Sequence, residues 1–211
     1  MNKLVHNPEA TQKALSILRS GENFNFYVIF LLVLILFIYF SEIKKKNWDG
    51  IAAGMGFYML QWFFEIMNAL FQTATGHALW TIPTGTAFLI LIGLGIELSL
   101  MFSIAGLAVS ETLPDNPDES FHGIPVKVIY IIGFSMFASL IEFLLSMTPT
   151  FVWIWEYWNA FTVFIFIYIP LFSAACFCYY WNPEKQRLFI GTLGLVNIVL
   201  LVVFAGILRI I

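Results

Sequence analysis

The strongest constraint on the fold of this chain is a series of apolar runs, joined by short polar connections. A helix needs about 20 apolar residues to cross a hydrocarbon core about 30 Å thick, and several runs reach that length. Of the 211 residues, 60% are hydrophobic and 11% are charged, and the mean hydropathy is +0.87. A soluble domain carries about 25% charged residues, and the runs lack the alternation of membrane β-strands. The sequence therefore predicts an all-α, polytopic membrane helix bundle.

The runs predict a transmembrane domain of about six helices over residues 23–211, with consecutive helices antiparallel. Residues 1–22 are predicted to form a short interfacial helix, because Asn7 suits an N-cap and Pro8 suits the first helical position. The fifth run is long for one crossing, and Pro170 is expected to kink it. The six helices are expected at residues 24–41, 49–71, 84–110, 127–147, 152–180 and 187–211.

The distribution of basic residues predicts the orientation of the chain. We define side A as the side of the bilayer that holds the N-terminus, and side B as the opposite side. Side B carries six Lys and Arg residues and side A carries four, with none in the side-A connections 72–83 and 148–151. Because cytoplasmic connections are enriched in Lys and Arg, the Lys-rich connections 42–48 and 181–187 are predicted to be cytoplasmic.

Four glutamates occur within these apolar spans, where a charged side chain costs about 2.5–3.5 kcal/mol at the bilayer centre. Counting from the predicted helix ends, Glu65, Glu142 and Glu156 lie near side A, whereas Glu97 lies nearer the midplane. The four side chains would thus form a funnel that opens to side A, with Glu97 at its floor. A carboxylic acid that burial keeps protonated is a competent proton donor.

Two of these glutamates lie in similar motifs, QWFFEIMNALF at residues 61–71 and VWIWEYWNAFT at residues 152–162. In each motif Trp, Glu and Asn follow at intervals of three, so they share one helix face. The amide would orient the carboxyl group, and the indole rings would line a cavity and attract positive charge. We predict that the catalytic residues are Glu65, Glu97, Glu142 and Glu156, and that the substrate-binding residues are Trp62, Asn68, Trp153, Trp158 and Asn159.

Several sites are disfavoured by the residues that the spans lack. No lysine lies well inside a span, and His6, His77 and His122 all lie outside the spans, which disfavours retinal, haem and di-iron sites. Neither a P-loop nor a Gly-x-Ser-x-Gly motif occurs. We therefore predict no cofactor, although carboxylates and amides suit Mg²⁺ or another hard divalent cation. The net charge of −3 gives no reason to expect nucleic acid.

Several segments resemble the small integral-membrane terpene cyclases of meroterpenoid and indole-diterpene pathways. These segments are WFFE at residues 62–65, IGLGIELSLMF at 92–102, IYIIGFSMFASLIEF at 129–143 and the aromatic start of the fifth run. The resemblance implies that an acid protonates an epoxide or alkene and that a carbocation cascade then closes rings. The helix-two acid of that family corresponds to Glu65. Its second acid lies in a seventh helix, and since six are predicted here, Glu142 or Glu156 would have to replace it.

We therefore expect an integral-membrane enzyme that performs acid-catalysed cyclisation or isomerisation of an isoprenoid or other lipid-soluble substrate. Glu65 would donate the proton, and Glu156 would be its partner or the final base. Two alternatives stay open. The same glutamates could be the ion ligands of a cation- or proton-coupled carrier, or they could join helices in a noncatalytic subunit that contacts other membrane proteins. The expected partners are the bilayer and a lipid-soluble small molecule.

Overall fold

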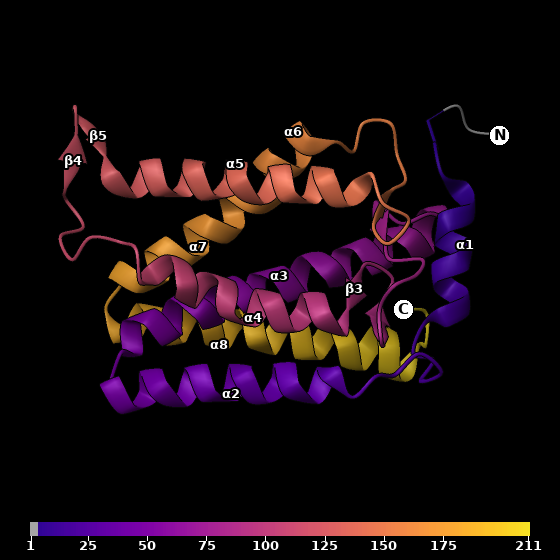
Figure 1. Ribbon diagram of the computed structural model, residues 1–211, viewed down its shortest axis with the longest axis horizontal. Coiled ribbons are helices and arrows are strands. Elements are labelled where there is room, and N and C mark those ends of the chain that lie inside the picture. Colours follow the sequence, from indigo (N-terminus) through magenta and orange to yellow (C-terminus); the bar gives the residue numbers. More distant parts are fainter. Residues whose placement is uncertain (1–3) are drawn as a thin grey trace.

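The computed structural model describes residues 4–211 as an antiparallel helix bundle (Figure 1). Four helical segments are long and apolar enough to cross a membrane, namely α2, α5, α6 through α7, and α8 through η2. The predicted all-α membrane bundle is confirmed. Its long helices are α2 (Tyr27–Lys45), α3 (Trp48–Thr75), α4 (Ile96–Ser110), α5 (Val126–Ser146), α6 (Ala160–Val163) continued by the π-helix η1 (Phe164–Tyr168) and α7 (Ile169–Tyr180), and α8 (Pro183–Leu200) continued by the π-helix η2 (Leu201–Ile207).

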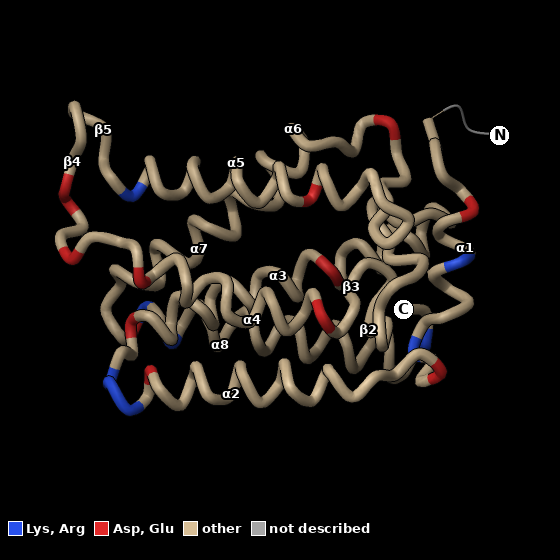
Figure 2. The backbone as a smooth tube through the Cα atoms, in the orientation of Figure 1, with Lys and Arg blue, Asp and Glu red and all other residues tan. Residues whose placement is uncertain are grey.

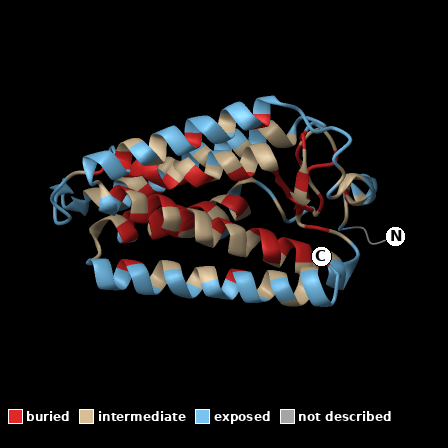
Figure 3. Ribbon diagram, turned by 90° about the horizontal axis from the view of Figure 1, so that it is seen from below, coloured by how far each residue is buried: buried red, intermediate tan, exposed pale blue. Residues whose placement is uncertain are grey.

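The helix α3 occupies the centre and packs against α4, α7 and α8. Small residues allow the close approach of α3 and α4, because a Cβ atom on Gly106 would lie 2.6 Å from the main-chain oxygen of Ala53. The helices α2 and α5 lie at the periphery and leave most of their apolar surface exposed. Figure 3 shows this division, with buried positions in the interior and exposed positions along the outer helices. Exposed apolar helix faces suit contact with lipid.

The third predicted helix, 84–110, begins twelve residues later than expected. Residues 76–95 form a buried irregular segment with three short strands, β1 (Trp80–Thr81), β2 (Leu89–Leu91) and β3 (Leu94–Gly95), of which β2 and β3 pair as a hairpin. Gly85 has φ +81°, a backbone conformation that favours glycine and that an α-helix does not contain. The apolar run therefore fills the side-A end of the bundle, and Leu89, Leu91 and Leu94 are almost fully buried.

The fifth predicted helix, 152–180, begins at Ala160, eight residues later than expected. Asn159 is the N-cap, and with Thr162 it forms a capping box that fixes this start. The preceding strand β6 (Val152–Trp153) pairs with β1 in antiparallel register, and Trp80 lies opposite Trp153. The predicted funnel at side A is therefore wrong, because the two loop segments cover this end of the bundle.

The helix α1 (Pro8–Ile17) lies across the same end (Figure 1). Asn7 occupies the N-cap position, but its side chain does not cap the helix; its Nδ2 donates to the main-chain oxygen of Trp153 at 3.2 Å. Thr11 and Ala14 are fully buried. The helix is thus fastened to the loop segments that close side A.

Charged residues gather at the two ends of the bundle, while acidic positions also occur on α3, α4 and α5 between the ends (Figure 2). At side B the carboxylate of Glu42 accepts from Lys45 Nζ at 2.7 Å and from Asn47 Nδ2 at 2.8 Å. Between α4 and α5 the side-B connection carries a hairpin of β4 (Ser120–Phe121) and β5 (Ile124–Pro125). At side B, Glu42 is thus bonded to its neighbours Lys45 and Asn47, apart from the acids inside the bundle.

Candidate functional site

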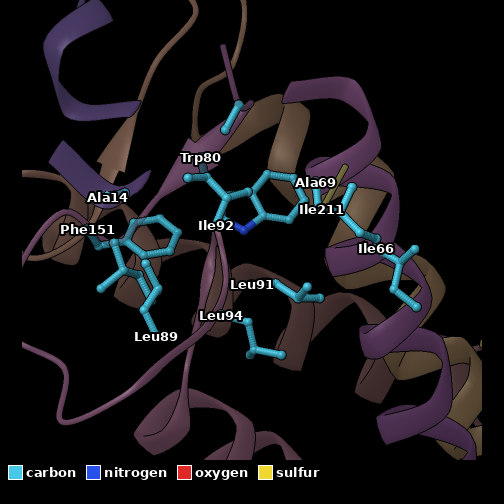
Figure 4. Packing of buried hydrophobic residues seen from close by; sticks show 12 residues of the cluster. Ala14, Ile66, Ala69, Trp80, Leu89, Leu91, Ile92, Leu94, Phe151 and Ile211 are labelled. Carbon is cyan, nitrogen blue, oxygen red and sulfur yellow. The ribbon is translucent and has the colours of Figure 1, made fainter. Parts of the chain in front are cut away.

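A small cavity lies between α3, α4, α5 and the η1–α7 helix, where two packed clusters of buried residues meet. Trp80 and Phe151, which belong to the cluster nearer side A, line this cavity. Tyr168 and Leu171, which belong to the cluster nearer side B, line it as well. Figure 4 shows Trp80 among aliphatic side chains of the buried segment and of α3. The cavity volume is about 50 Å³, which is room for a few water molecules.

Two glutamates line this cavity, each held by two donors. The Glu65 carboxyl accepts from Gln61 Nε2 at 3.2 Å and from Trp80 Nε1 at 3.2–3.3 Å. The Glu142 carboxyl accepts from Trp153 Nε1 at 2.9 Å and from the Tyr168 hydroxyl at 2.6 Å. Donors that fix a carboxyl group also fix the direction in which its remaining lone pairs or proton point.

The β1–β6 pair explains how loop residues reach both acids. Trp80 and Trp153 are direct partners across this antiparallel pair, so their side chains lie on the same face. One indole N–H donates to Glu65 and the other to Glu142. A two-residue strand pair thus positions both carboxyl groups in one apolar cavity.

The other two predicted acids lie elsewhere. Glu97 is in the first turn of α4, where it accepts from Thr86 Oγ1 at 2.6 Å, from the Ala87 amide at 2.7 Å and from the Tyr27 hydroxyl. Glu97 therefore fastens the buried segment to α2 and α4, and it does not lie at the floor of a funnel. Glu156 is in the exposed side-A loop, 4.0 Å from His6 Nε2, because the helix predicted to contain it begins only at Ala160.

The predicted binding residues are likewise divided. Trp153 touches Glu142, and Trp158 stacks on Trp80 with ring centroids 5.4 Å apart. Asn68 is fully buried, but its Nδ2 donates to the Trp80 oxygen at 2.9 Å and its Oδ1 accepts from the Leu79 amide at 2.8 Å. The remaining two lie away from the cavity, Trp62 edge-on to Tyr58 and Asn159 at the N-terminus of α6.

Sequence analysis missed three residues of the site, namely Gln61, Trp80 and Tyr168. Gln61 lies four residues before Glu65 on the same helix face, which is a signal that was available. Its Oε1 is buried and has no hydrogen-bond partner among the described residues. Tyr168 is a hydroxyl within a strongly apolar run, a weaker signal, and nothing in the sequence indicated that Trp80 reaches Glu65.

The residues described around the cavity include no basic side chain that could neutralise the two acids. Among the described residues that line the cavity there is no Lys, Arg or His. Two carboxylates buried together without a counter-charge are costly, so the arrangement favours at least one protonated carboxyl group or a positively charged guest. Within residues 4–211 no group of three or more His, Cys, Asp or Glu side chains is placed to hold a metal ion.

Comparison with known proteins identifies the family. A model of an uncharacterized membrane protein family matches residues 8–206. The chain belongs to this family. An uncharacterized protein of Archaeoglobus fulgidus is 38% identical over 206 residues, which cover 95% of this chain and 98% of the relative. No solved structure matches.

The family assignment corrects the resemblance to terpene cyclases. The match falls on an uncharacterized membrane protein family and not on that cyclase family, and the archaeal relative is similar along almost its whole length. The short strings that carried the resemblance consist mostly of Phe, Ile, Leu and Gly, residues that any packed membrane helix uses.

Proposed function

We propose that this integral membrane protein is an enzyme that transfers protons to and from a lipid-soluble substrate at Glu65 and Glu142. The observation that carries the proposal is that both carboxyl groups line one apolar cavity, each oriented by two donors. A protonated carboxyl and an ionised one in the same site form an acid–base pair. In an isomerisation, one donates a proton to a carbon of a double bond and the other removes a proton from a neighbouring carbon, so the substrate keeps its atoms.

The surroundings of the cavity favour access from lipid. Its two ends along the bundle are closed by the packed clusters that contain Leu94 and Leu171, both fully buried. Its flank between α4 and α5 is lined by Met101 and Ile141, which are 50% and 40% exposed on the outer surface. A molecule dissolved in the hydrocarbon reaches this flank without crossing the packed ends.

The same packing weighs against a carrier. A carrier needs polar paths to both sides of the membrane, whereas buried apolar residues stand between the cavity and each end. A subunit role would make the two acids contacts between helices, but it gives no reason for both to line a cavity with the unpartnered Gln61 Oε1. We retain the expected orientation as part of the proposal, with side B and its Lys-rich connections in the cytoplasm.

Hydrogen exchange tests the proposed reaction directly. The purified protein is returned to vesicles made from membrane lipids of its source cells, in D₂O, and the lipids are then examined by mass spectrometry. We expect one lipid species to gain deuterium. Glu65→Gln and Glu142→Gln should each slow the gain by about 10²–10⁴-fold, the usual contribution of a general acid or base.

Glu156→Gln is the matched control, because Glu156 lies in the exposed side-A loop outside the cavity, and it should leave the rate unchanged. Thermal unfolding of all three variants separates loss of chemistry from loss of fold. If no lipid gains deuterium, or if the gain persists in the Glu65→Gln, Glu142→Gln double variant, the proposed function is wrong.

A further inference from the structure

The β4–β5 hairpin at the side-B end holds two large apolar side chains away from the packed bundle. Phe121 of β4 and Ile124 of β5, here called the apolar pair, are 64% and 51% exposed. They are direct partners across the antiparallel strands, so both project from the same face of the hairpin. Within residues 4–211 neither belongs to the two packed clusters of the bundle. Packing inside the bundle therefore gives no reason for two large apolar residues at this place.

The turn of the hairpin fixes the apolar pair in position. His122 and Gly123 have φ angles of 49° and 82°. Positive φ at both central residues is the geometry of a type I′ turn, whose twist matches that of the two strands. The Val126 amide adds a hydrogen bond to the Glu119 oxygen at 2.8 Å. The hairpin thus keeps its shape through its own main chain and presents the two apolar side chains together.

The hairpin lies at the level where α5 enters the membrane. Pro125 is followed directly by Val126, the first residue of α5, and α5 is one of the helices able to cross a bilayer. The exposed apolar face of α5 begins with Val128 and Ile129. A crossing helix begins near the edge of the hydrocarbon, which places the hairpin among the lipid headgroups of side B. Figure 1 shows the hairpin extending outward from the beginning of α5, on the side away from α3, so it reaches over the lipid beside α5.

Size and charge favour lipid over a protein as the partner of this surface. A stable protein–protein interface uses about 20–30 residues a side, whereas the apolar pair is two side chains on one hairpin face. Phe beside aliphatic side chains is typical of segments that lie in the membrane interface. Lys127, in the first turn of α5, is placed to attract lipid phosphate groups. The exposed acids Asp115, Asp118 and Glu119 all precede the hairpin, so the polar part of the connection stays in water.

We propose that the apolar pair inserts into the side-B leaflet, at the boundary between the headgroups and the acyl chains. The hairpin then anchors the beginning of α5 to the lipid surface, and interfacial anchors set the tilt and rotation of a crossing helix. This surface is separate from the acid cavity, so the inference does not depend on the proposed function.

Spin labelling in vesicles tests the insertion. Phe121→Cys and Ile124→Cys are labelled one at a time with a nitroxide in the full-length protein, whose native cysteines are buried, and the protein is returned to phosphatidylcholine vesicles. The accessibility of each nitroxide to oxygen, which concentrates in hydrocarbon, is compared with its accessibility to a water-soluble nickel chelate. We expect both nitroxides to lie about 5–10 Å into the interface, the depth of other interfacial apolar faces.

Three reference positions calibrate this depth. Asp118→Cys, on the exposed loop before the hairpin, should be open to the nickel chelate. Met136→Cys, a 60% exposed position ten residues into α5, should give the highest ratio of oxygen to nickel accessibility. Ser120→Cys is the matched control, because Ser120 belongs to the same hairpin but lies opposite Pro125 on its other face. It should resemble Asp118→Cys and not its neighbour Phe121→Cys.

A second substitution tests whether the apolar side chains cause the insertion. With the nitroxide at Ile124→Cys, Phe121→Ser should shift the label toward water, whereas Phe121→Leu should leave its depth unchanged. The inference is wrong if the nitroxides at 121 and 124 are as open to nickel as the one at Asp118→Cys. It is also wrong if both reagents are excluded from them, which would indicate a covering protein surface, or if spin–spin broadening shows a second copy of the chain at the hairpin.

Discussion

At the scale of single residues, Asn68 and Asn159 occupy equivalent places in two similar motifs and have different surroundings. Asn68 joins the buried segment to α3 through the Trp80 oxygen and the Leu79 amide. We expect Asn68→Ala to lower the free energy of unfolding by at least about 2 kcal/mol, because two main-chain groups lose their partner. Asn159→Ala removes an exposed N-cap and should cost about 1 kcal/mol.

Thermal unfolding of both variants in the same detergent checks this difference. Equal effects, or a larger effect at Asn159, would contradict the assigned contacts.

The motif predicted that each amide would lie beside its glutamate. The partners of Asn68 belong instead to residues 79 and 80, and spacing within one helix holds no information about a loop that folds back onto it. Glu65 was identified from its apolar context, whereas its donor Trp80 was not, for the same reason.

At the scale of elements, the close contact of α3 and α4 depends on Gly106. In Gly106→Ala the new Cβ atom would lie 2.6 Å from the Ala53 oxygen and 2.6 Å from Phe57 Cβ. The two helices must then separate, and we expect a loss of about 1–3 kcal/mol, as in other overpacked cores. Gly133 in α5 has no atom within 4 Å of such a Cβ position. Gly133→Ala should therefore be neutral or stabilise by up to about 1 kcal/mol through helix propensity.

Comparing the thermal midpoints of these two variants separates packing from propensity. A stabilising Gly106→Ala would show that α3 and α4 do not approach as closely as described.

Hydropathy predicted the order of the long helices correctly because a span needs only length and apolar composition. It placed two helix starts wrongly, since residues 76–95 and 152–159 are apolar but fold as loops and short strands. Hydropathy measures how apolar a segment is, and it does not distinguish a lipid-facing helix from a segment buried in protein.

At the scale of the whole molecule, the acid pair lies inside a bundle whose side-A end is covered by α1 and two loop segments. The sequence located acids in apolar surroundings, and the funnel that it predicted depended on helix ends that the loops displaced. What replaces the funnel is a small cavity whose flank between α4 and α5 carries the exposed apolar side chains of Met101 and Ile141. Access to the carboxyl groups therefore depends on how the bundle sits in the bilayer.

The orientation of the bundle gives the last prediction. Both native cysteines, Cys176 and Cys178, are fully buried, so the wild-type protein should not react with a membrane-impermeant maleimide. Introduced single cysteines then report each side, Glu156→Cys in the exposed side-A loop and Asp118→Cys in the exposed side-B hairpin connection. If the Lys-rich side B is cytoplasmic, intact cells should label Glu156→Cys and leave Asp118→Cys unlabelled until the membrane is permeabilised. The reverse pattern would place side A in the cytoplasm, and labelling of both before permeabilisation would contradict a bundle that spans the membrane in one orientation.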